Sequence, residues 1–252
     1  GFLAPLLIGT AVGTFFTGSA FTVNKNAVGD AIMPTISQWT NAWHGLEAVT
    51  NPFNVAFGLM VMLLAVSLGA LYMINNISNE ELSKRLRKSL LVSFTGFLVI
   101  FLFVVYNLFT MEGFAVNENN IITMQEGKYL TNIIDMPVVL VMFLTGAVLL
   151  VAGVVLTLIK QTFTRGIWPS AIGTVIAVMA IFMIAGYNGT AYYPSVADLQ
   201  SSLTLANSCS SEFTLKTMAI VSLIIPFVVA YIAYFWHKMD KKQLTREEIE
   251  TS

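Results

Sequence analysis

The sequence predicts an all-α integral membrane protein whose helices pack as a bundle. Of its 252 residues, 56% are apolar and 11% are charged, whereas soluble domains average nearer half apolar and one quarter charged. The apolar residues form runs of about the length, roughly 20 residues, that a membrane-spanning helix requires. Lys and Arg gather in alternate connections between these runs. A net charge of -1 without a basic stripe excludes an extended nucleic-acid surface.

We expect six spans in a single membrane domain over residues 1–252. The first span, residues 1–16, is shorter than the roughly 20 residues needed to cross a bilayer, so we expect the sequence to begin inside or at the edge of a helix. Its Pro5, Gly9 and Gly13 recur every four residues, a spacing that lets helices approach closely in lipid. The five complete spans are expected at residues 52–74, 89–109, 136–159, 168–187 and 215–236.

Prolines mark the ends and one interior position of these spans. Pro52, Pro137 and Pro169 stand at span starts, where the missing N–H leaves no helical hydrogen bond unmade. Pro226 lies inside the last span, and it predicts a kink there.

The connection over residues 17–51 contains a further candidate helix. Ile36, Trp39, Trp43 and Leu46 recur in it at helical spacing. This pattern predicts an outer interfacial helix over residues 34–48, with the indoles at the depth of the lipid headgroups.

The distribution of basic residues predicts the orientation. Ten of the thirteen Lys and Arg residues fall in alternate connections or in the tail, residues 238–252: Lys84, Arg85, Arg87, Lys88, Lys160, Arg165, Lys238, Lys241, Lys242 and Arg246. The opposite loops hold Lys25, Lys128 and Lys216. The positive-inside rule therefore predicts a cytoplasmic C-terminus and polar outer loops. In the tail, Thr245 and Glu248 have capping-box spacing, which favours a short helix.

The spans offer no reactive group for catalysis. Away from their ends they contain no Asp, Glu, Lys, Arg or His, the residues that mark intramembrane proton relays and ion sites. His44 and His237 would lie on opposite sides of the membrane, so they cannot ligate one metal together, and we read both as interfacial residues. The Met residues are read as packing. We expect solvated charges at the outer-loop acids, which are Asp30, Glu47, Glu112, Glu118, Glu126, Asp198 and Glu212.

Sequence motifs for other chemistry are also lacking. The single cysteine, Cys209, excludes an intrachain disulfide, and no Cys/His cluster is present. Serine-hydrolase, nucleotide-binding and zinc-protease signatures are absent. We therefore assign no catalytic, cofactor-binding or metal-ligating residue in this chain.

The polar stretch before the last span carries the most distinctive pattern of the sequence. Its key positions are Tyr193, Pro194, Ser195, Ser202, Leu203, Thr204, Ser208, Cys209, Ser210, Ser211, Thr214, Leu215 and Met218. Pro226 and Tyr231 in the following span, the tail KKQLTREEIE and the upstream segments PLLIGTAVGTFFTG and NPFNVAFGL extend the pattern over nearly the whole chain. In this order they resemble subunit II of the cytochrome bd-type quinol oxidases. Cys209 departs from the small residue usual near its position.

This resemblance implies a membrane oxidase that takes electrons from quinol and reduces dioxygen to water with protons from the cytoplasm. Two haems b and a third haem, d or b, would be ligated by subunit I. Subunit II would be its haem-free structural partner, with a role in proton delivery and, in some members, a bound quinone. Small single-helix accessory subunits are further expected partners, and the location is a bacterial or archaeal cytoplasmic membrane. Family subunits have nine spans, so these six would be the last, with about three spans and the family's acidic residues preceding them.

A stand-alone carrier for a small solute is an alternative of a different class. It requires a polar cavity at half-depth, and the candidate hydroxyls are Ser67, Ser93, Thr95, Thr145, Thr157 and Thr174. Hydroxyls within helices usually bond back to their own backbone, which disfavours this alternative. A purely structural membrane scaffold differs little from the oxidase subunit taken without its partner.

Overall fold

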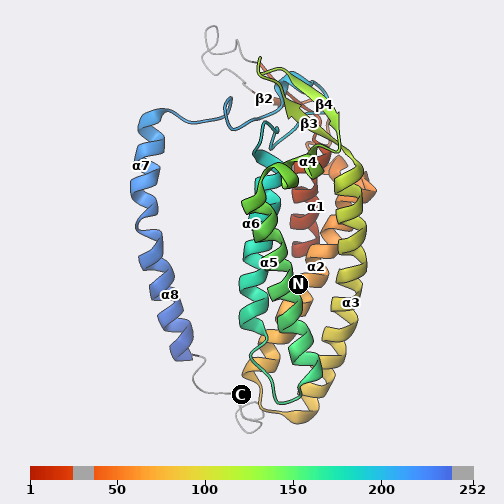
Figure 1. Cartoon of the computed structure of the whole chain (residues 1–252), viewed down its shortest axis with the longest axis vertical. Helices are drawn as coiled ribbons and strands as arrows, with labels where there is room; N and C mark the ends of the chain where they lie inside the picture. The colour runs from red at the N-terminus through yellow and green to blue at the C-terminus, as the bar shows by residue number, and fades with distance from the viewer. Residues whose placement is uncertain (25–36, 240–252) are drawn as a thin grey trace.

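The computed structural model describes residues 1–24 and 37–239 of the chain. Most of its helices run side by side in a bundle, with short strands gathered at one end (Figure 1). Within the described part, five helical segments are long and apolar enough to cross a membrane. They are α2 (Pro52–Asn76), α3 (Glu80–Thr110), α5 (Pro137–Ile159), α6 (Ile167–Gly186) and the pair α7 (Glu212–Ser222) and α8 (Ile225–Met239). With the shorter apolar helix α1 (Leu3–Thr17), they confirm the predicted all-α membrane class.

Local capping explains where α2 and α3 begin. The Asn51 side chain accepts a hydrogen bond from the Phe53 amide, with Pro52 in the first turn of α2. Asn79 caps α3 in the same way by accepting from the Leu82 amide. Helix α3 therefore extends at its start beyond the span predicted over residues 89–109.

Small residues bring the helices of the bundle close together. An added Cβ at Gly9 would lie 2.8 Å from Cα of Gly58, and one at Gly13 would lie 2.9 Å from Cα of Asn54. These contacts confirm the close packing predicted from the spacing in α1. Helices α5 and α6 meet in the same way, since a Cβ at Gly173 would lie 2.6 Å from the Gly146 carbonyl oxygen.

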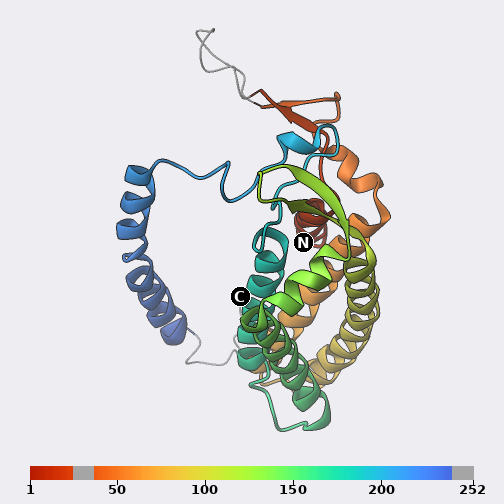
Figure 2. The ribbon, with the colours of Figure 1, turned by 45° about the horizontal axis from the view of Figure 1, so that its top comes forward.

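The outer connections contain more secondary structure than the loops that we expected. Strand β1 (Phe21–Val23) pairs antiparallel with β2 (Ser37–Trp39), and β3 (Glu112–Val116) pairs antiparallel with β4 (Ile122–Glu126). Helix α4 (Lys128–Asp135) follows the second hairpin, and a short 3-10 helix, η2 (Leu199–Ser201), lies in the last loop. Figure 2 shows this cap of strands above the bundle.

The helix predicted over residues 34–48 is wrong for the described part of that range. Ser37–Trp39 form β2, and the 3-10 helix η1 begins only at Leu46 and ends at Thr50. His44 and Gly45 have φ angles of 48° and 90°, and two consecutive left-handed residues interrupt a right-handed helix. Glu47 closes this turn by accepting from the Asn41 side chain and the Gly45 amide.

The kink predicted at Pro226 is confirmed. Helix α7 ends at Ser222 and α8 begins at Ile225, because proline cannot donate the hydrogen bond that would continue the helix. The α7–α8 segment stands apart from the bundle in both views (Figures 1 and 2), and none of its apolar window is buried. It touches α2 where the rings of Trp236 and Tyr72 lie 6.2 Å apart.

Candidate functional site

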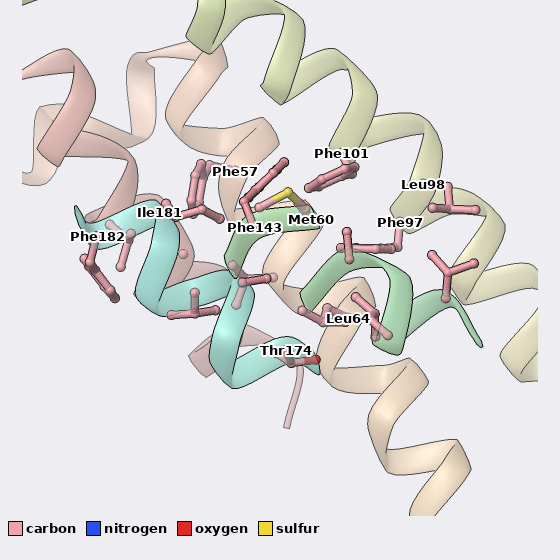
Figure 3. A pocket seen from close by; sticks show the side chains of 18 of the residues that line it. Phe57, Met60, Leu64, Phe97, Leu98, Phe101, Phe143, Thr174, Ile181 and Phe182 are labelled. Carbon is pink, nitrogen blue, oxygen red and sulfur yellow. The ribbon is translucent and has the colours of Figure 1, made fainter. Parts of the chain in front are cut away.

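The candidate site is an apolar cavity of about 290 Å³ between α1, α2, α3, α5 and α6. Aromatic rings from several of these helices point into it (Figure 3), with Phe57 from α2, Phe97 and Phe101 from α3, and Phe143 from α5. The rings of Phe97, Phe101 and Phe143 are stacked in sequence, with centroids 5.6 Å and 6.2 Å apart. Helix periodicity creates this wall, because positions 97 and 101 lie one turn apart on one face of α3.

The cavity has no group for acid–base or redox chemistry. Among the described residues that line it, only Thr174 has a hydroxyl, and its Oγ1 donates to the Ser170 carbonyl at 2.8 Å. Met60 places its sulfur among the phenylalanine rings (Figure 3), where thioethers commonly fill space. A partly open apolar site of this size suits a small hydrophobic molecule or a segment of hydrocarbon chain.

The hydroxyls that a solute carrier would need do not form a polar cavity. Ser67 bonds to the Leu63 carbonyl and to Ser93 Oγ, at 2.8 Å and 2.9 Å, within the α2–α3 contact. Thr157 donates to the Gly153 carbonyl at 2.8 Å. Thr95 and Thr145 are exposed on the outer faces of their helices.

The two histidines remain apart from any metal-binding cluster. His44 lies in the outer turn between β2 and η1, whereas His237 lies in the last turn of α8. Over residues 1–24 and 37–239, no group of three or more His, Cys, Asp and Glu side chains could hold a metal ion.

The distinctive polar stretch folds back onto the start of the chain. Ser195 is fully buried, its hydroxyl donates to the Phe21 carbonyl, and its amide donates to Ser202 Oγ at 2.9 Å. Tyr193 and Leu203 pair through their backbones in both directions, at 3.3 Å and 2.8 Å. The Ser195 hydroxyl fastens the loop before α7 to β1, and the other bonds hold the loop together, so Ser195 and Ser202 are structural in the outer cap.

Comparison with known proteins identifies the family. The family model described as "Cytochrome bd terminal oxidase subunit II" matches residues 1–239. The chain belongs to this family. Among curated proteins, it is 24% identical over 262 residues to "Cytochrome bd-I ubiquinol oxidase subunit 2" of Escherichia coli strain K12, and equally to that of Escherichia coli O157:H7. Each match covers 99% of this chain and 65% of the relative, so the chain spans about two thirds of the length of these relatives.

One buried polar cluster, at the outer end of the bundle, was not predicted from the sequence. Asn132 on α4 is fully buried and donates to the Ile184 carbonyl and Thr190 Oγ1, at 2.8 Å and 2.7 Å. The Tyr129 hydroxyl donates to the Phe16 carbonyl at 3.2 Å. Burial raises the pKa of Tyr129, so this donor keeps its proton.

A sequence signal for this cluster does exist. The segment KYLTNIID places Tyr129, Asn132 and Ile133 at helical spacing, and all three side chains are buried. Helix α4 has only eight residues, and a helical pattern of apolar residues this short does not stand out from the surrounding loop.

Proposed function

We propose that this chain is the haem-free structural subunit of a bd-type oxidase, which passes electrons from quinol to dioxygen. The observation that carries this proposal is the family match over residues 1–239. The names of the curated relatives, ubiquinol oxidase subunit 2, supply the reaction class. In this proposal two haems b and a third haem, d or b, are held by a larger partner, subunit I, and small accessory subunits join the complex.

The exposed apolar surface supports a partner within the membrane. Phe213, Phe227 and Trp236 on the α7–α8 segment are 80%, 76% and 57% exposed. Lipid can cover such side chains, and so can the helices of another subunit. The C-terminus of the chain is placed in the cytoplasm on the positive-inside argument, in a bacterial or archaeal cytoplasmic membrane.

The cavity gives this subunit a second proposed role, as a site for the tail of a bound quinone. Its wall of Phe57, Phe97, Phe101 and Phe143 suits an isoprenoid chain, because both are apolar. The wall has no charged residue, so we assign none of the proton-delivery residues to these helices.

Purification of the tagged chain from its native membrane, in mild detergent, tests the proposal. We expect a larger haem-bearing protein to co-purify, with Soret absorption and quinol-dependent oxygen consumption. When the two are separated, the haem absorption should remain with the partner. A haem-free, monodisperse preparation would contradict the proposal. Solute uptake into vesicles that contain only this chain would revive the carrier alternative.

A further inference from the structure

A shallow, largely open groove runs along α3 beside Leu63 of α2, from the end of the bundle where these helices connect. Its volume is about 480 Å³. It is lined by Leu63, Arg85, Lys88, Ser89, Val92 and Ser93. This groove lies outside the apolar cavity described above, since the two have no lining residue in common.

Polar and apolar side chains are separated along the groove. Three lining residues follow Arg85 by three, four and seven positions, namely Lys88, Ser89 and Val92. At these spacings the four residues share one face of α3. The cations and the hydroxyl lie toward the helix start at Glu80, and Val92 lies deeper along the span. Val92 is 68% exposed, so the described residues leave the apolar part of this face uncovered.

The positive charge at this groove is only weakly neutralised by the protein. Arg85 pairs with Glu81 at 2.7 Å, but both side chains are largely exposed, and such pairs hold little energy. Lys88 has no ion pair with any described residue. The Ser89 hydroxyl is exposed and forms no hydrogen bond within residues 1–24 and 37–239, so it is free to donate.

A neighbouring residue holds this end of the bundle in place. The Arg87 guanidinium donates to the carbonyls of Gln161 and Phe163, at 2.8 Å and 3.3 Å, in the connection between α5 and α6. Arg87 therefore fixes α3 against the other helix pair and does not line the groove. The groove has one cation without an ion pair to a described residue, Lys88, a second that pairs only at the surface, Arg85, and a hydroxyl donor above an apolar face.

We propose that this groove binds one anionic phospholipid. Its phosphate would lie between Arg85 and Lys88, with Ser89 donating to a phosphate oxygen and an acyl chain along Val92 and Leu63. Basic pockets between transmembrane helices suit anionic headgroups, and charge-assisted hydrogen bonds to phosphate are strong. A zwitterionic lipid fits less well because its own cation would lie near the two basic side chains. An apolar helix of another protein would bury both cations without a partner.

Native mass spectrometry of the purified complex tests this proposal. The delipidated complex is titrated with phosphatidylglycerol, with phosphatidylcholine and with soluble glycerol phosphate. We expect phosphatidylglycerol to bind and the other two to bind weakly. The double variant R85Q/K88Q should weaken phosphatidylglycerol binding about thirtyfold, since each basic residue near a membrane surface contributes on the order of 1 kcal/mol.

The control variant K84Q/R165Q removes two positive charges from the same end of the molecule without altering the lining of the groove. It should keep the affinity of the unmodified complex. An equal loss of phosphatidylglycerol affinity in both double variants would show that the lipid responds only to net positive charge at this end of the molecule. That result would overturn the specific site. Displacement of the lipid by glycerol phosphate would overturn the choice of lipid over a soluble phosphate.

A second measurement holds even if the double variant fails to fold. A photo-crosslinking amino acid in place of Val92, with every charge intact, is activated in the native membrane. We expect a phospholipid adduct on this residue. A peptide adduct would show that another protein segment occupies the groove, and would overturn the proposal.

Discussion

Lys128 is a basic side chain that the fold buries, with only 7% of its surface exposed. Its Nζ donates to the Asn188 carbonyl at 2.8 Å. The Asn188 backbone is left-handed, with φ of 57°, and its side chain donates to Asn132 and Asp135, each at 3.2 Å. Burial lowers the pKa of Lys128, and attraction to Asp135 opposes the shift in part.

The lowered pKa of Lys128 predicts a pH-dependent stability. An unfolded lysine keeps its proton up to about pH 10.4, whereas folded Lys128 releases its proton at a lower pH. Between these two pKa values the unfolded state binds more protons, so the free energy of unfolding rises with pH. The variant K128M should lose this rise. Thermal unfolding of the purified protein from about pH 8 to about pH 10.5 measures it.

The variant K160M is the matched control, because Lys160 is exposed in the α5–α6 connection. It should follow the pH dependence of the unmodified protein. If K128M keeps the same rise with pH as K160M, then burial of Lys128 does not shift its titration.

At single residues, the sequence predicts backbone effects better than burial. Pro226 predicts the break between α7 and α8, because proline blocks helix continuation through its own covalent structure. From the sequence, Lys128 is expected to be a basic residue of an outer loop. Its burial depends on Asn188, which lies 60 residues away in the chain, and no local pattern reports such a contact.

Among the elements, the α5–α6 pair depends on glycine at its contact surface. A Cβ at Gly173 would lie 2.6 Å from both the Gly146 carbonyl oxygen and the Leu150 amide nitrogen. Both neighbours are backbone atoms, so neither can move aside by changing rotamer. Helices in lipid associate through this kind of close packing.

The variant G173A should therefore destabilise the protein by about 1 to 3 kcal/mol, the usual cost of overpacking. The midpoint of thermal unfolding in detergent measures the effect. G69A is the control, because Gly69 lies within α2 and an added Cβ there meets nothing within 4 Å. It should be neutral or stabilise by up to about 1 kcal/mol, since alanine favours helix. Equal destabilisation by both variants would contradict the packing argument.

The long elements could be predicted from the sequence, and the short ones could not. An apolar run such as Pro137–Ile159 is recognised by length alone. Strands β3 and β4 have five residues each and α4 has eight, so none is long enough for its apolar pattern to stand out from the surrounding loop. The outer helix expected around Trp39 and Trp43 was wrong because helical spacing of apolar residues does not report the left-handed turn at His44 and Gly45.

For the molecule as a whole, the membrane class follows from composition, but the cavity does not. Residues such as Phe57, Phe101, Phe143 and Thr174 come from four different helices. Whether these residues line a common cavity depends on how closely and at what angle the helices pack. The small residues at the helix contacts determine that packing. The sequence therefore predicts apolar helices correctly, and the arrangement between them has to come from the structure.

Orientation in the membrane is the remaining whole-molecule property, and Cys209 offers a direct test. It is the only cysteine of the chain and is exposed in the loop before α7. Arg87, near the start of α3, and Arg165, in the α5–α6 connection, lie at the opposite end of the spans. The positive-inside rule places that end in the cytoplasm. A membrane-impermeant maleimide should therefore label Cys209 in intact spheroplasts without permeabilisation.

The double variant C209S/T162C moves the single thiol to the exposed connection between α5 and α6. This thiol should react only after the membrane is permeabilised. Labelling of T162C but not Cys209 in intact spheroplasts would invert the orientation. It would also place the Arg85 and Lys88 groove in the outer leaflet, where the same lipid chemistry would then have to be sought.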